Sequence, residues 1–294
     1  MHPDQLAALV AVVDTGSFEA AARELRITPS AVSQRVKALE RAWSRVLVVR
    51  TSPCVATPDG EVLLRLARQV AELAADASAQ LDPDGAGRRR LPVVVNADSL
   101  ATWFAAVLAE AATWDDCMLE LLIEVEDHGT AHLRTGETVG AVTSDPAPVP
   151  GCTVEPLGVM RYLPVCTPEL LDRHGQRAGD PDWAALPMVR FSDRDDLQHR
   201  LLARHGVAAA HTEHRIPSSQ AFAFAVRRGL GWALLPEAQL GDALATGALT
   251  RLGGAREHLD VHLAWQSWRL GSARTTRLGE AVHRAARAGL RAAR

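Results

Sequence analysis

The chain has 294 residues, which is enough for two or three domains at about 100–200 residues each. Hydrophobic residues make up 47% of the chain and charged residues 23%, which excludes a disordered protein and indicates a soluble globular one. The formal net charge of −3 excludes a uniformly basic coat for nucleic acid, although it permits a local basic patch.

The sequence gives no signal for export, membrane insertion or metal binding. No apolar run approaches the ~20 residues needed to span a bilayer, and residues 1–4 lack the basic region of a signal peptide. The four cysteines are scattered without a CxxC pair or zinc spacing, so we expect buried thiols in a reducing cytoplasm and no metal site. These cysteines are Cys54, Cys117, Cys152 and Cys166.

Residues 1–58 are predicted to form short helices followed by a β wing. After a first apolar helix, Ser17 is a good N-cap for a second helix with an Ala-rich apolar stripe. A short turn leads to Thr28, which caps a third helix with Pro29 at its first position. Residues 46–50 are β-prone and form the candidate wing. Two helices joined by a short turn, with a polar second helix, indicate a helix-turn-helix.

Residues 59–79 are predicted to form one longer helix between domains. Its apolar residues recur in steps of three and four, which is the pattern of a helix that pairs with a second chain. The predicted dimerisation residues are Leu63, Leu66, Val70, Leu73 and Ala77.

A Pro- and Gly-containing segment separates this helix from the rest of the chain. After it, short β runs alternate with helical stretches over 200 residues, which indicates parallel α/β architecture in two lobes. The predicted divisions are a winged helix-turn-helix over 1–58, a linker and dimerisation helix over 59–80, a hinge linker over 81–90 and an effector-binding domain over 91–294. Lobe I is expected at about 91–163 and 266–294, and lobe II at about 164–265.

The positive charge is concentrated on the third helix and the wing. Between Arg23 and Arg50 there are seven basic and two acidic side chains. Basic side chains hold phosphates, while short polar side chains on a helix in the major groove reach base edges. The predicted DNA-binding residues are Thr28, Pro29, Ser30, Ser33, Gln34, Arg35, Lys37, Arg41 and Arg50.

The N-terminal motifs resemble the signature of LysR-type transcriptional regulators. The motifs are Phe18-x-x-Ala21-Ala22-x-x-Leu25, Thr28 to Val36, Leu39-Glu40, and Arg50 before Thr57-Pro58-Asp59-Gly60. The resemblance extends over the whole chain. It implies a winged helix-turn-helix, a linker helix and an α/β effector domain of two lobes like a periplasmic binding protein, assembled as a homodimer or homotetramer. It also implies a small-molecule effector in place of a cofactor.

Further motifs resemble the ArgP/LysG subgroup of that family. They are the order Gln34-Arg35, Val49 to Cys54, Asn96 to Ser99 with Thr102-Trp103, and Met160 to Val165. This resemblance implies a sensor of lysine or arginine that activates an exporter gene. Within the inferred lobed fold, the effector is expected in the crevice between the lobes.

The turn after the β run at residues 91–95 is predicted to hold the effector's α-carboxylate. Free amides at a helix N-terminus favour an anion, Ser99 and Thr102 could add hydroxyls, and Asp98 would then pair with the α-ammonium. A buried cationic side chain needs a second carboxylate, with Asp127, Asp195 and Asp196 as candidates. Thr143, Ser218 and Ser219 are expected at the same crevice, whereas His128 is expected on a surface loop.

Three other functions remain open from the sequence. Arg161 and Arg194 would suit a regulator that senses an aromatic or metabolic carboxylate. A constitutive DNA-binding protein with a vestigial pocket is the second. An enzyme with an appended DNA-binding domain is the third, and it is disfavoured because the GxGxxG, GxxxxGK and GxSxG motifs are absent from the sequence.

Overall fold

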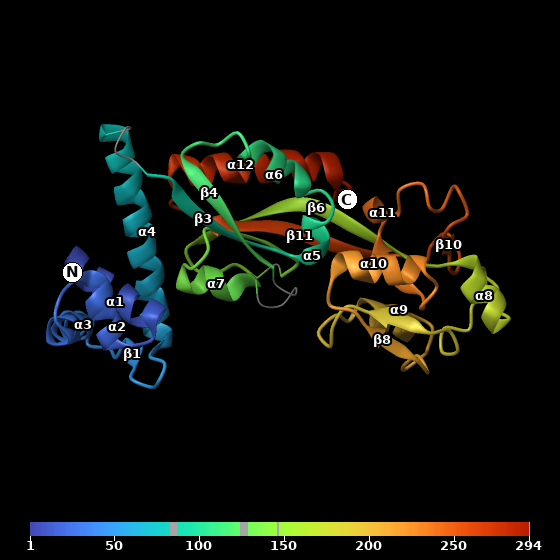
Figure 1. Ribbon diagram of the computed structural model, residues 1–294, viewed down its shortest axis with the longest axis horizontal. Coiled ribbons are helices and arrows are strands. Elements are labelled where there is room, and N and C mark those ends of the chain that lie inside the picture. Colours follow the sequence, from blue (N-terminus) through green and yellow to red (C-terminus); the bar gives the residue numbers. More distant parts are fainter. Residues whose placement is uncertain (83–86, 124–128, 146, 294) are drawn as a thin grey trace.

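The computed structural model describes residues 1–82, 87–123, 129–145 and 147–293. A small helical domain lies at one end, a long helix stands beside it, and two lobes follow along the long axis of the molecule (Figure 1).

The small domain is the predicted winged helix-turn-helix. Ser17 Oγ accepts from the Ala20 N–H at 3.0 Å, and Thr28 Oγ1 accepts from the Ala31 N–H at 3.2 Å, so both predicted caps are confirmed. The helices pack their apolar faces on one another around residues such as Leu9 and Val36. The elements are α1 (Pro3–Thr15), α2 (Phe18–Leu25), α3 (Pro29–Trp43) and the wing strands β1 (Val48–Val49) and β2 (Val55–Ala56).

Helix α4 (Pro58–Leu81) presents three different faces to its surroundings. Leu63, Leu64 and Ala67 pack into the core of the small domain. A second face docks on lobe I, where the buried Glu72 accepts from Ser272 Oγ at 3.0 Å and Arg68 donates to the Thr135 carbonyl at 2.6 Å. The third face carries exposed apolar residues.

Lobe I is built on parallel strands β3 (Arg89–Val95), β4 (Cys117–Ile123) and β5 (Gly140–Thr143). Helix α12 (Ala273–Gly289) and the shorter α6 (Ala105–Ala111) lie on one side of the sheet, and α7 (Gly129–Thr135) lies on the other (Figure 1). The four-residue helix α5 (Ala97–Leu100) directly follows β3, so it occupies the carboxyl end of that strand.

The predicted parallel α/β architecture is present in β3, β4 and β5 of lobe I, whereas the strands at the centre of the molecule are antiparallel. Strands β6 (Cys152–Cys166) and β11 (Leu259–Trp268) are long, pair antiparallel with each other, and run through both lobes (Figure 1). With β9 (Ala233–Pro236) and β10 (Thr250–Arg251) added, the strand order is β10-β6-β11-β5-β3-β4, and β9 pairs with β6. Each long strand contains polar as well as apolar residues. The sequence therefore predicted only its apolar segments, as short separate strands.

Lobe II surrounds the other ends of β6 and β11. The elements of this lobe are α8 (Pro168–His174), β7 (Met188–Arg190), α9 (Leu197–Arg204), β8 (Glu213–Arg215), α10 (Ser219–Arg227), β9 (Ala233–Pro236), α11 (Glu237–Leu240) and β10 (Thr250–Arg251). Strands β7 and β8 form a separate parallel pair beside helices α9 and α10 (Figure 1). The boundary residues of the domains and lobes stay a prediction.

All four cysteines are buried free thiols, as the sequence predicted. Burial raises the pKa of Cys166 to about 12, so this thiol stays protonated and unreactive at neutral pH.

Candidate DNA-binding surface and effector site

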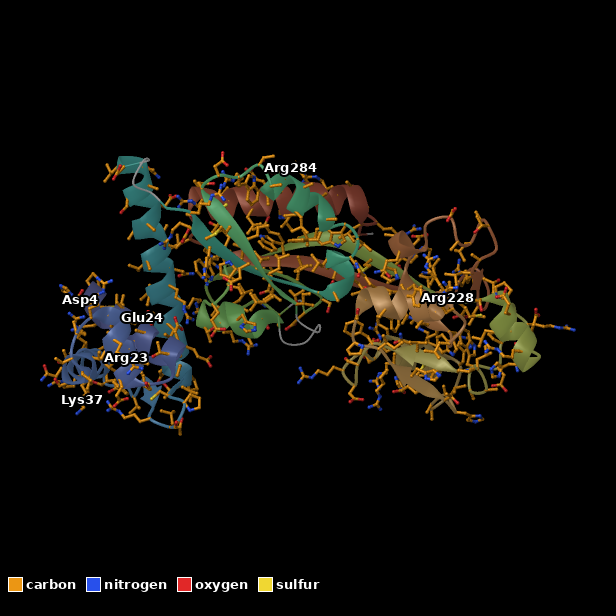
Figure 2. The ribbon with its side chains drawn as sticks, viewed as in Figure 1. Asp4, Arg23, Glu24, Lys37, Arg228 and Arg284 are labelled. Carbon is orange, nitrogen blue, oxygen red and sulfur yellow. The ribbon has the colours of Figure 1, made fainter. Side chains whose placement is uncertain are left out.

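Most of the predicted DNA-binding side chains lie on the outer surface of the small domain. Thr28, Pro29, Ser30, Gln34, Lys37, Arg41 and Arg50 are exposed, and Ser33 and Arg35 are half-buried. Figure 2 shows Lys37 on the outer side of the domain, away from the two lobes. Val32, Val36 and Leu39 turn the opposite face of α3 into the core, which fixes the polar face outward.

Local contacts orient three of the predicted phosphate-binding cations. Arg35 pairs with Asp4 of α1 at 3.0 Å, and Arg41 Nε donates to the Lys37 carbonyl at 3.2 Å. The Arg50 guanidinium lies 4.6 Å from the centre of the Phe18 ring, which places the start of the wing against α2. Arg41 and Arg50 keep these positions without an acidic partner among the described residues.

A cavity lies where the two lobes meet. Lobe I contributes the turn Asn96–Asp98, and Tyr162 on β6 and Leu234 on β9 line it beside them. Lobe II contributes Phe222 of α10 and a cluster between β7 and the first turn of α9, namely Phe191, Arg194, Asp195, Leu197 and Gln198. The site is therefore at the carboxyl end of β3, in the crevice predicted from the fold.

Asp98 joins the two lobes by hydrogen bonds. Its Oδ2 accepts from Tyr162 Oη at 2.9 Å, and its Oδ1 accepts from Ser219 Oγ at 2.9 Å. Ser219 Oγ in turn accepts from Gln239 Nε2 at 3.0 Å. Burial raises the pKa of the Asp98 carboxyl, and the two hydrogen bonds offset that effect only partly. A cation in the cavity would stabilise the ionised carboxylate.

Asp195 is the second carboxylate of the cavity. It accepts from the backbone N–H of Phe191 at 3.2 Å and of Leu197 at 3.1 Å, which fixes it at the start of α9. Burial raises its pKa as well, and its negative charge contributes to the raised pKa of Asp98. Two half-buried acids on one cavity, one of which disfavours the ionisation of the other, form a site for positive charge.

Three of the predicted effector residues, Ser99, Thr102 and Thr143, lie outside the lining of this cavity, and their role in effector binding stays a prediction. Ser99 Oγ accepts from Trp103 Nε1 at 3.0 Å, and Thr102 Oγ1 donates to the Asp98 carbonyl at 2.6 Å. Thr143 is buried in lobe I and accepts from the Asp145 N–H at 3.0 Å. Asn96, rather than Asp98 or Ser99, is the N-cap of α5, and its Oδ1 accepts from the Ser99 N–H at 2.7 Å. The hydroxyls of Ser99 and Thr102 therefore stabilise the turn that holds Asp98.

The remaining effector candidates separate into different environments. Ser219 contacts Asp98, whereas Ser218 caps α10 and accepts from the Ala221 N–H at 3.4 Å. Asp196 is exposed, lies outside the lining, and faces Arg200 at 3.9 Å, so it is not the second acid of the cavity. Asp127 and His128 lie outside the described residues.

The two arginines that favoured a carboxylate ligand also differ. Arg161 forms a bidentate pair with Asp260, with both N–O distances at 2.7 Å, and lies outside the cavity lining. Arg194 lines the cavity and is exposed, so it can meet an anionic group at the mouth.

The dimerisation prediction for α4 needs one correction. Leu63 is only 6% exposed because it packs in the core of its own small domain, and Leu66 is partly buried against the same core. Val70 and Leu73 are each 38% exposed, and Ala77 is exposed beside them. The exposed apolar stripe extends to Val62 and Leu81, in steps that a helix brings to one face.

Within the described residues, no group of three or more His, Cys, Asp and Glu side chains is placed to hold a metal ion. The helices over the same ranges include none that is long and apolar enough to cross a membrane.

Sequence reasoning missed two polar residues of the cavity. Tyr162 is the single tyrosine of the chain and lies among the buried residues of the second half of β6. Gln198 lies on the apolar face of α9 between Leu197 and Leu201. In both cases a polar side chain occupies a position where the pattern of apolar residues predicts a core residue, and this mismatch could have identified it.

Comparison with known proteins agrees with this architecture. Residues 3–61 match the bacterial regulatory helix-turn-helix protein model of the lysR family, and residues 84–287 match the LysR substrate binding domain. The lysine export transcriptional regulatory protein LysG of Corynebacterium efficiens is 48% identical over 99% of this chain and 100% of its own length. Its name agrees with the prediction that the chain is not an enzyme.

Two solved structures are similar over nearly the whole chain. Full-length LysG from Corynebacterium glutamicum with bound effector Arg has a TM-score of 0.88 and 45% identity, over 99% of this chain and 100% of that one. ArgP from Mycobacterium tuberculosis has a TM-score of 0.90 and 43% identity, over 98% of each chain. The chain belongs to the LysR family of bacterial helix-turn-helix transcriptional regulators, in the ArgP/LysG subgroup.

Proposed function

We propose that this regulator senses a basic amino acid, arginine or lysine, in the cavity between its lobes and activates an exporter gene in response. The observation that carries the proposal is the charge of the cavity. Asp98, Asp195 and Arg194 supply two negative groups and one positive group. A basic amino acid carries two positive groups and one negative group, so each charged group of the ligand can pair with an opposite charge in the cavity lining.

Each charge has a proposed partner. Asp98 and Asp195 bind the two cationic groups of the effector, and Arg194 binds the α-carboxylate at the mouth. The rings of Phe191 and Phe222, whose centres are 6.4 Å apart, supply apolar wall for the methylene groups of the side chain. Ion pairing is required here because a buried cation without a carboxylate costs more free energy than burial returns.

The proposed signal is a change in how the lobes are held together. In the structure described here, Ser219 of lobe II donates to Asp98 of lobe I. An effector cation that pairs with Asp98 competes with this hydroxyl and adds its own contacts to both lobes. The effector then favours one lobe arrangement by its difference in affinity for the two. Lobe I contacts α4 through Glu72 and Arg68, which gives the change a route to the DNA-binding domain.

We also propose that the protein acts in the cytoplasm as a homodimer or homotetramer on double-stranded DNA. The exposed stripe Val62, Val70, Leu73, Ala77 and Leu81 supports pairing of α4 with its copy, since apolar residues at this spacing form a helix–helix seam. The outward face of α3 supports base contacts by Ser33 and Gln34 and phosphate contacts by the arginines and Lys37. A dimer presents two such helices to a two-fold operator.

The test is selection of genomic DNA by the purified full chain, with and without arginine or lysine. We expect a small set of bound fragments upstream of a transporter gene, with a footprint that changes when the amino acid is added. A footprint that responds instead to benzoate or citrate would replace the basic effector with a carboxylate. A footprint that responds to none of these compounds would reject the sensor.

A further inference from the structure

Gln198 is a buried polar residue whose side-chain oxygen is unpaired in the described part of the molecule. It lies in the first turn of α9 and is 1% exposed. Its Oε1 has no hydrogen-bond partner among the described residues. A buried polar atom left unpaired costs free energy, so such atoms in native proteins are rare and indicate a partner that is supplied from elsewhere.

Gln266 is a buried glutamine of the same chain whose side chain is fully hydrogen-bonded within the protein. It is 0% exposed, and its carboxamide is fully engaged. Its Oε1 accepts from the Val149 N–H at 3.1 Å, and its Nε2 donates to the carbonyls of Asp145 at 3.1 Å and Ala147 at 2.9 Å. Gln198 is as deeply buried, yet within the described ranges its Oε1 is unpaired and the residue lines a cavity.

The surroundings of Gln198 define what its carboxamide can meet. It lines the cavity together with Asp98 and Asp195. Each oxygen of these two carboxylates already accepts one hydrogen bond from the protein. Asp195 and Gln198 both come from the start of α9, so they face the same end of a bound molecule. A group there needs several N–H donors to serve the carboxylate and the carboxamide together.

We infer that the Gln198 carboxamide accepts a hydrogen bond from the side-chain cation of the effector and makes the site prefer a guanidinium to an ammonium. The inference rests on the proposed function and assigns the specificity of that same cavity. A guanidinium carries five N–H donors in a planar fork and can reach the Asp195 carboxylate and the Gln198 oxygen at once. An ammonium is a compact point charge with three donors, and it loses less when the carboxamide is removed.

The test measures calorimetric affinity for arginine and for lysine, and the melting temperature without ligand, on the full chain and three variants. Gln198→Leu keeps the volume and removes the acceptor. It should weaken arginine binding by about ten- to hundredfold and lysine binding less, while the melting temperature stays equal or rises. Gln198→Glu keeps an acceptor and should retain arginine binding. The control Gln266→Leu should lower the melting temperature and leave the arginine-to-lysine ratio unchanged.

Two results would overturn the inference. One is an unchanged arginine-to-lysine ratio in Gln198→Leu. The other is a melting temperature that falls in Gln198→Leu as it does in Gln266→Leu, which would assign Gln198 to the fold. If the unaltered chain binds neither amino acid, the proposed function itself fails and the inference fails with it.

Discussion

The Asp98 side chain makes hydrogen bonds that join the two lobes, and its carboxylate is negatively charged when ionised. Tyr162 and Ser219 hold its two oxygens, and these partners come from the shared strand β6 and from lobe II. The carboxylate therefore lies at the junction that must respond to the effector. Its raised pKa reflects the cost of keeping a buried negative charge when no cation is present.

Replacement of Asp98 by Asn should abolish the response to basic amino acids. The amide has nearly the same shape but no charge, so the cationic group loses its partner, and we expect binding weaker by about a hundredfold or more. Calorimetric titration with arginine measures the loss, and circular dichroism checks that the fold is kept. Arginine affinity equal to that of the unaltered chain would remove Asp98 from the site.

The raised pKa values of Asp98 and Asp195 predict opposite pH trends for stability and for binding. Their folded pKa values lie above the ordinary carboxyl value of 3.8, so the folded state binds more protons in that window. The contribution of these two carboxyls to the stability of the unliganded chain, measured as the difference from an Asp98→Asn and Asp195→Asn double variant, should therefore fall as pH rises from about 4 through the raised values. Arginine affinity should rise over the same window, because the cation needs ionised carboxylates. Melting curves and titrations between pH 4 and 8 measure both trends. Parallel trends would contradict this assignment.

The three faces of helix α4 make different contacts. Apolar residues in its first half anchor the small domain, and polar residues fasten it to lobe I. The buried Arg274 of α12 adds to this attachment, with Asp116 at 3.1 Å and Asp76 of α4 at 3.8 Å. The stripe around Val70 and Leu73 is left facing solvent. A stripe of this kind on a soluble protein indicates a partner surface.

A charge on that stripe should separate the copies. Leu73→Asp places a carboxylate in the proposed seam and should yield monomers with unchanged secondary structure and much weaker operator binding, since one half-site remains per molecule. Ala71→Asp adds the same charge to an exposed position away from the stripe, and it should leave the assembly intact. Light scattering with attached chromatography gives the mass. Equal masses for the two variants would contradict pairing through this face.

The sequence predicts local elements better than it predicts which side chains meet. The helix-turn-helix follows from caps and apolar periodicity, both of which depend on near neighbours, so Ser17 and Thr28 were identified correctly. Leu63 was misassigned because a heptad pattern does not say whether a residue faces its own domain or another chain. Ser99 and Thr102 make hydrogen bonds within their own turn and lie outside the cavity lining, because a hydroxyl at a helix start bonds to the turn as readily as to a ligand. Gln198 reaches the cavity only through the packing of lobe II, which local spacing does not encode.

At the scale of the whole molecule, three parts are connected through shared elements. Strands β6 and β11 run through both lobes, and their pairing is irregular at Leu263 and Ala264. After α12, Arg291 pairs with Val159 of β6 through the backbone and holds Glu237 of lobe II at 2.9 Å through its side chain. The long helix α4 connects lobe I with the DNA-binding domain (Figure 1). A ligand between the lobes therefore acts at one end of a continuous chain of packed elements.

Calorimetric titration of the full chain with arginine and lysine, with benzoate and citrate as acidic controls, tests the proposed effector class. We expect saturable binding of both basic amino acids at one site per chain, with no heat of binding for the acids. Saturable binding of benzoate or citrate, without binding of arginine or lysine, would contradict it, because the two carboxylates of the cavity would then face an anion.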